Sequence, residues 1–98
     1  MDSNLFEWHE PKRLANLKNH HIDFEDAKRI FAGPCLERPD RRRDYGEERW
    51  ISVGVVEGYE IVVVYTWRGK KRRLISARRA HERERKEYRR ALLERAGS

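Results

Sequence analysis

A chain of 98 residues has room for one hydrophobic core, so we expect a single domain that spans residues 1–98. A single cysteine argues against internal disulfides and cysteine metal clusters. The sequence has no apolar run near the roughly 20 residues of a membrane span and no signal-peptide pattern, so we expect a cytoplasmic protein without a membrane partner. The net charge is +6, but residues 1–67 hold 10 Lys and Arg against 13 Asp and Glu, a balance of −3, whereas residues 68–98 hold 13 against 4, a balance of +9.

The first third of the chain predicts one short strand and two helices. Residues 6–8 alternate in polarity as a strand does, and Pro11 suits the first turn of a helix that stops near His20. A second helix is expected to begin with Asp23 as its N-cap and to end at Gly33. Its buried face would hold Phe24, Ala27 and Phe31.

The middle of the chain predicts a loop followed by an antiparallel meander. Residues 38–46 are polar and contain two breakers, which is typical of a loop. Three strands follow at residues 49–56, 59–67 and 72–78, with turn residues between them. Alternation places one apolar stripe on the first of these strands, at Ile51, Val53 and Val55. We therefore expect a sheet with one side covered by the two helices and one side left open.

The last strand and the segment after it carry most of the basic charge. Alternation separates the side chains of the strand into two sets, which are Arg73, Ile75 and Ala77 on one face and Arg72, Ser76 and Arg78 on the other. Residues 80–96 predict a helix with few apolar residues in its first two turns, so this helix docks loosely or waits for a partner. The fold class is α+β, with two N-terminal helices packed on an antiparallel β-sheet and a C-terminal helix after it.

The sequence lacks the patterns of metal sites, phosphate-binding glycine loops and serine hydrolases, so we expect no metal and no other cofactor. The four histidines have no ligand spacing with Cys or Glu, and neither Ser52 nor Ser76 lies in a nucleophile elbow. What remains is arginine, glutamate, lysine and histidine around an open sheet. These side chains can cleave RNA through its own 2′-hydroxyl, a reaction that needs a base, an acid and cations on the phosphate but no metal.

The predicted topology brings some of these residues together. In an antiparallel meander, the start of one strand lies beside the end of the next. Glu48 and Arg49 stand at the start of one strand and Arg68 at the end of its neighbour, so we expect these three to be close. Arg78 ends the third strand at the opposite edge, and it would join them only through the twist of the sheet or a groove across it.

Five motifs in order along nearly the whole chain resemble the BrnT toxins of bacterial type II toxin–antitoxin systems. They are Phe6-Glu7-Trp8 with Lys12 and Asn16; His20 with Ile22, Phe24 and Ala27; the run from Asp44 to Trp50; Val63 to Thr66 with Arg68-Gly69; and Ile75 to Ala80 with Glu84 and Tyr88. The chain departs from the family at His9, where an acidic or amide residue is usual, and at His21, where a glycine is usual at a helix end expected to be left-handed.

The resemblance implies a RelE-like fold and an endoribonuclease that cleaves RNA and so inhibits translation. It also implies a partner, a DNA-binding antitoxin similar to BrnA, which forms a hetero-oligomer with the toxin and carries it to operator DNA. By position, the residues implied for catalysis are Glu48, Arg49, Arg68 and Arg78, and those implied for phosphate contacts are Lys18, His20, Arg72 and Arg79.

Our first hypothesis is therefore a metal-independent ribonuclease toxin. Arg68 and Arg78 would hold the scissile phosphate, Arg49 would stabilise its developing charge, and Glu48 or His20 would move the proton; a base that titrates near pH 7 favours His20. Trp50 and Trp67 suit either base stacking or core packing.

Two alternatives stay open. The first is a non-enzymatic RNA-binding module in which the same arginines only clamp phosphates. The second is a protein-interaction unit whose basic helix at residues 80–96 docks an acidic partner. An antitoxin segment on that helix would make the second alternative compatible with a toxin.

Overall fold

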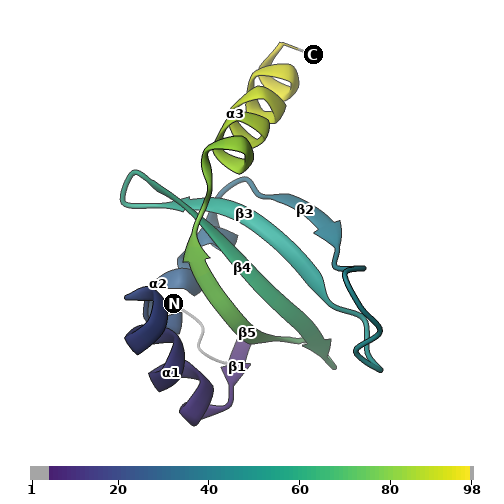
Figure 1. The fold of residues 1–98 in the computed structure, drawn as a ribbon. Helices are drawn as coiled ribbons and strands as arrows, with labels where there is room; N and C mark the ends of the chain where they lie inside the picture. Colours follow the sequence, from purple (N-terminus) through teal and green to yellow (C-terminus); the bar gives the residue numbers. More distant parts are fainter. Residues whose placement is uncertain (1–4, 98) are drawn as a thin grey trace.

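The computed structural model describes residues 5–97 as one five-stranded sheet with helices packed against it (Figure 1). Along the chain, the elements are β1 (Phe6–Trp8), α1 (Glu10–His20), α2 (Phe24–Ala27), the 3₁₀ helix η2 (Lys28–Ala32), β2 (Leu36–Pro39), β3 (Trp50–Val56), β4 (Tyr59–Arg68), β5 (Lys71–Arg79) and α3 (Glu82–Ala96). The α+β class is confirmed. No helix within residues 5–97 is long and apolar enough to cross a membrane.

The sheet is mixed, so the expectation of a purely antiparallel sheet is wrong at one edge. The strand order is β1-β5-β4-β3-β2, and β1 pairs with β5 in parallel while the other three pairs are antiparallel. After β1 the chain leaves the sheet through the helices and returns at the far edge as β2. This crossover leaves β1 free to run in the same direction as β5.

The predicted loop at residues 38–46 overlaps a strand that the sequence did not indicate. β2 covers Leu36–Pro39 and pairs with β3, with Leu36 opposite Val53 and Pro39 opposite Trp50. Three of its four residues are exposed, which hides the apolar alternation of a strand. Proline is tolerated there because an edge strand has one side without hydrogen-bonding partners.

The first expected helix is confirmed, whereas the second is shorter and less regular than expected. α1 ends at His20, and His21 takes the left-handed conformation, with φ 61° and ψ 27°. α2 begins after Asp23 as predicted but continues for only one α-helical turn before it tightens into η2. Its buried residues, Phe24, Ala27 and Ile30, are three apart, which is the period of a 3₁₀ helix. The structure thus has one regular N-terminal helix and a short helical segment where two helices were expected.

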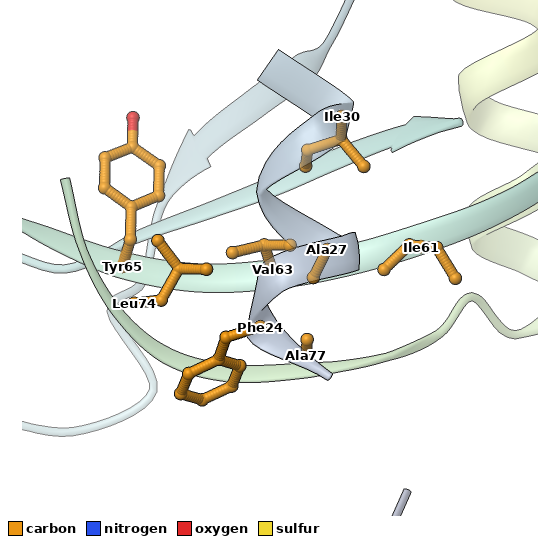
Figure 2. Close-up of a cluster of buried hydrophobic side chains, with 8 residues drawn as sticks. All are labelled: Phe24, Ala27, Ile30, Ile61, Val63, Tyr65, Leu74 and Ala77. Atoms are coloured by element: carbon orange, nitrogen blue, oxygen red, sulfur yellow. The ribbon is translucent and has the colours of Figure 1, made fainter. Parts of the chain in front are cut away.

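The main hydrophobic core lies between this helical segment and one side of the sheet, which we call the α2 face (Figure 2). The buried members of the cluster are Phe24, Ala27, Ile30, Ile61, Val63, Tyr65, Leu74 and Ala77. Packing is tight at β3, because a Cβ on Gly54 would lie 2.6 Å from the Cβ of Ile30. Glycine at position 54 therefore allows η2 to approach the sheet.

α1 is attached to the sheet through one buried amide, that of Asn16. Its Nδ2 donates to the carbonyl oxygens of Ile22 and Ala77, at 2.9 Å each, and its Oδ1 accepts from the Ala77 N–H at 3.0 Å. β1 pairs with β5 only as far as Leu74. Asn16 therefore provides the hydrogen-bonding partner that a longer β1 would have given to β5.

A β-bulge in β5 changes which side chains share a face. Val64 pairs with Ser76 and the next residue, Tyr65, pairs with Leu74, so Ile75 is the extra residue. Ile75 consequently packs with the cluster on the opposite side of the sheet, the α3 face, whereas Leu74 and Ala77 both lie in the main core. The prediction that Ile75 and Ala77 share a face is wrong, because strict alternation does not continue through a bulge.

The α3 face is less open than expected. Ile51, Val53, Val62 and Val64 form a second buried cluster with Ala80 and with Tyr88 of α3, while α3 itself projects away from the sheet (Figure 1). The first two residues of the predicted apolar stripe of β3 are buried, but on the α3 face and not under the two N-terminal helices as expected, while Val55 is exposed. The Tyr88 hydroxyl donates to the carbonyl oxygen of Pro34 at 2.8 Å, and Arg89 binds Glu60 at 2.8 Å. Polar contacts thus supplement the few apolar residues of this helix.

Replacement of Asn16 by alanine tests the role of the buried amide. Asn16→Ala leaves the N–H and carbonyl of Ala77 buried without partners, which we expect to lower the free energy of unfolding by about 2–4 kcal/mol. Urea denaturation measures the change. The control Asn19→Ala lies on the exposed surface of the same helix, where we expect a change within about 0.5 kcal/mol. Equal effects of the two substitutions would contradict the role assigned to Asn16.

Candidate active site

A basic hollow of about 350 Å³ lies where the start of α1, the loop before β3 and the paired ends of β4 and β5 meet. Its lining contains four cations, one carboxylate and one imidazole, and we call it the basic hollow. The lining residues are His9, Lys12, Glu47, Arg49, Thr66, Arg68, Arg73, Leu74 and Ile75. A concave surface with this excess of positive charge attracts anions.

Glu47 links the two predicted arginines of the hollow. Its Oε2 lies 3.0 Å from Nε of Arg49, and its Oε1 lies 3.9 Å from Nη2 of Arg68. The guanidinium of Arg49 also stacks 4.0 Å from the centre of the Tyr45 ring. Arg68 keeps 56% of its side chain exposed, so its remaining N–H groups face solvent and a ligand can reach them.

The loop that carries Arg49 is fixed by a hydrogen bond to β4. The Thr66 hydroxyl, which is buried, donates to the carbonyl oxygen of Glu48 at 2.6 Å. Arg73 is held from the other side by Glu7 of β1, at 2.7 Å. Residues distant in sequence therefore meet at the hollow because β4 and β5 position all of them.

Of the predicted site residues, the structure brings Arg49 and Arg68 together in the hollow. Glu48 is exposed and lines a neighbouring pocket with Arg41 and Arg43, so its carboxylate is not part of the hollow lining. His20 and Lys18 are exposed near the end of α1, and His20 lies about 15 Å along the helix from Glu10 at its start. The structure does not place His20 or Lys18 at the hollow.

Arg78 lies on the α3 face but is held by a carboxylate. Its two terminal nitrogens bind the two carboxylate oxygens of Glu84, at 2.8 and 2.9 Å. Glu84 also accepts the backbone N–H of His81 and so caps α3. Arg78 pairs with Val62 and Arg73 pairs with Thr66, which places these two arginines about 13 Å apart along the strands. The predicted partnership of Arg78 with Arg68 has no support in this geometry.

The two remaining predicted phosphate contacts, Arg72 and Arg79, stack on aromatic rings. The Arg72 guanidinium lies 4.1 Å from the ring centre of Phe31 and 4.6 Å from that of Trp67. Because of the bulge, Arg72 shares the α2 face with Leu74 and not the face of Arg78, which corrects the predicted arrangement. Arg79 lies 4.3 Å from the Tyr59 ring, at the other end of β4.

Sequence reasoning missed four members of the hollow: His9, Lys12, Glu47 and Arg73. His9 was noted only as a departure from the family pattern. Arg73 was assigned to the covered face because alternation was continued across the bulge. The signal for Glu47 was present, since it adjoins Glu48, but a sequence does not determine which of two adjacent loop residues faces the hollow.

Neither metal ligation nor thiol chemistry finds support in residues 5–97. They contain no group of three or more His, Cys, Asp and Glu side chains that could hold a metal ion. Burial raises the pKa of the Cys35 thiol to about 11, with the nearby Glu37 carboxylate adding to the effect. A thiol with so high a pKa is a poor nucleophile near neutral pH.

An arginine-lined hollow on a small α+β protein is the kind of surface that binds the phosphates of a polyanion. The model of the family described as "Ribonuclease toxin, BrnT, of type II toxin-antitoxin system" matches residues 8–84. The chain therefore belongs to the BrnT family of ribonuclease toxins.

A solved structure supports the same assignment. The crystal structure of the Brucella abortus ribonuclease toxin BrnT is similar to this chain, with a TM-score of 0.64 and 28% sequence identity, over 79% of this chain and 96% of that chain. No match was found among curated proteins.

The ion pair of Arg78 and Glu84 predicts a dependence of stability on pH. The hydrogen bonds from Arg78 lower the pKa of Glu84 to about 2 from its ordinary value of 4.5. The carboxylate therefore stabilises the fold fully above pH 4.5, and this stabilisation is lost as the pH falls toward 2. We expect Glu84→Gln to cost roughly 1–3 kcal/mol at pH 7 and about half of that or less at pH 3.

Urea denaturation of the wild type and of Glu84→Gln across this pH range measures the difference. Other carboxylates, such as that of Asp40 with its pKa of about 2, titrate in both proteins and cancel. A difference that stays constant from pH 7 to pH 3 would show that Glu84 is not held as a carboxylate by Arg78.

Proposed function

We propose that this chain is the toxin of a type II toxin–antitoxin pair and cleaves RNA at the basic hollow without a metal ion. The observation that carries the proposal is the composition of the hollow, in which Lys12, Arg49, Arg68 and Arg73 surround Glu47 and His9. Cations for the phosphate and two groups able to transfer protons thus occur at one surface. These are the components that cleavage by a 2′-hydroxyl requires.

In the proposed reaction, the 2′-oxygen attacks the adjacent phosphorus and the bond to the 5′-oxygen breaks, which leaves a 2′,3′-cyclic phosphate and a 5′-hydroxyl. Arg68 holds the scissile phosphate and Arg49 stabilises the charge that develops on it. A base removes the 2′-hydroxyl proton and an acid protonates the leaving 5′-oxygen. We assign these two proton transfers to Glu47 and His9, because these side chains line the hollow and Glu48 and His20 do not.

The family membership also supports the remaining parts of the proposal. We infer a DNA-binding antitoxin, similar to BrnA, that neutralises this chain in a hetero-oligomer and brings it to operator DNA. We likewise propose a RelE-like fold and action in the cytoplasm, where RNA and the translation machinery are present. Inhibition of translation follows if messenger RNA is the substrate.

The test incubates the purified protein with a naked, end-labelled RNA in EDTA. We expect fragments with 2′,3′-cyclic phosphate ends, and we expect Arg68→Ala to lower the cleavage rate by roughly 100-fold, since it removes a charge from the transferring phosphate. The matched control is Arg29→Ala, which removes the same charge from an exposed arginine outside the hollow lining. We expect the control to cleave at close to the wild-type rate.

Three results would contradict the proposal. Loss of cleavage in EDTA would indicate a metal-dependent enzyme, and cleavage of an RNA with 2′-deoxy nucleotides would exclude the 2′-hydroxyl as nucleophile. RNA that is bound but remains intact, both naked and with ribosomes added, would favour the non-enzymatic binding module.

A further inference from the structure

Trp67 is a large aromatic side chain that the fold leaves on the surface. It is 45% exposed, whereas Trp8 and Trp50 are partly buried against the main core. It lies near the tip of the β4–β5 hairpin, directly before Arg68 of the basic hollow and opposite Arg72 in the strand pairing. A tryptophan with this exposure is not explained by core packing.

The inner side of Trp67 is supported by residues that hold the ring in place. The Arg72 guanidinium lies between Phe31 and Trp67, 4.1 and 4.6 Å from their ring centres, and Tyr65 contacts Trp67 edge to face with ring centres 5.7 Å apart. Nε of Arg72 is buried without a hydrogen-bond partner. Arg72 therefore serves the aromatic stack, and the exposed part of the indole is left to contact a ligand.

The surroundings of Trp67 indicate what this ligand is. The hairpin tip carries Arg68, Lys70 and Lys71, and within residues 5–97 the two lysines form no ion pair. An exposed ring among unpaired cations is the combination that binds single-stranded nucleic acid, since bases stack on the ring and phosphates contact the cations. A partner protein that covered this tip would need several carboxylates around an aromatic contact.

The chain contains a natural comparison at the other end of β4. Tyr59 is 54% exposed and stacks on Arg79, so it resembles Trp67 in exposure and in its arginine neighbour. Its surroundings differ, because Asp26 and Glu57 balance the charges of Arg29 and Arg79 in the adjoining pocket. Tyr59 thus has the same kind of stack without the basic surface.

We propose that Trp67 is a base-stacking platform for single-stranded RNA and that Arg72 positions it. The inference rests on the proposed function, because it assigns to Trp67 a base of the same RNA strand whose phosphate Arg68 holds. Trp67 and Arg68 are consecutive in β4, so their side chains leave opposite faces of the sheet, and the RNA strand reaches both of them by passing around the hairpin tip. Trp67 thereby contributes to the choice of cleavage position.

The test measures binding separately from cleavage, with a short single-stranded 2′-O-methyl oligoribonucleotide that cannot supply the nucleophile. Fluorescence anisotropy gives the affinity. We expect Trp67→Ala to weaken binding roughly tenfold, the loss of one stacked base, and Trp67→Phe to retain most of the affinity. Tyr59→Ala is the matched control and should bind like the wild type. Thermal unfolding of each variant shows that the fold is intact.

The salt dependence of binding distinguishes a positioning role of Arg72 from a phosphate contact. If Arg72 contacted a phosphate, Arg72→Ala would reduce the slope of log affinity against log salt concentration by about 0.7, the value for one phosphate of a single strand. We expect weaker binding with an unchanged slope, because Arg72 acts through Trp67. A reduced slope would overturn the positioning role.

The outcomes separate this inference from the proposed function. Binding that depends on Trp67 in a protein that cleaves no RNA would support the platform and contradict the nuclease. Cleavage with wild-type affinity in Trp67→Ala would overturn the platform and leave the nuclease standing. Loss of antitoxin binding in Trp67→Ala, with unchanged RNA affinity, would assign the ring to the protein partner and also overturn the platform.

Discussion

Eight residues of β4, Ile61 to Arg68, pair with eight of β5, and β5 carries the extra residue Ile75 between them. The other functional features depend on it. The bulge lets Leu74 and Ala77 both enter the main core, and it places Arg73 beside Thr66 on the face of the basic hollow and Arg72 on the opposite face. Without the extra residue, the core residues or the arginines would lie on the wrong side of the sheet.

The hollow is assembled from three separate parts of the chain against this strand pair. Thr66 fixes the loop of Glu47 and Arg49, Glu7 of β1 holds Arg73, and α1 begins at the same place with Lys12 in its first turn. The Asn16 amide keeps α1 against β5 beyond the end of β1. The cations of the hollow are thus positioned by neutral or already paired groups. Arg68, which is 56% exposed and has only a 3.9 Å contact with Glu47, is the cation that we propose for the phosphate.

The fold class, most elements and the partnership of Arg49 with Arg68 could be predicted from alternation, helix caps and strand order. The parallel β1 could not, because three residues carry no information on direction, and β2 was hidden by its exposure. The ion pair of Arg78 could not be predicted, because its carboxylate, Glu84, is six residues away in the next helix and not beside it in sequence. His9 and Arg73 were missed because their positions depend on a helix start and on the bulge.

The central claim is that RNA lies over the β4–β5 hairpin tip and the basic hollow, although much of the basic charge is on α3. Photo-crosslinking of a 2′-O-methyl oligoribonucleotide with 4-thiouridine, followed by mass spectrometry of the linked peptides, tests this directly. We predict crosslinks to residues 45–49 and 66–75 and at the start of α1. Crosslinks confined to the exposed basic side chains of α3, such as Arg83, Lys86 and Arg90, would contradict the account.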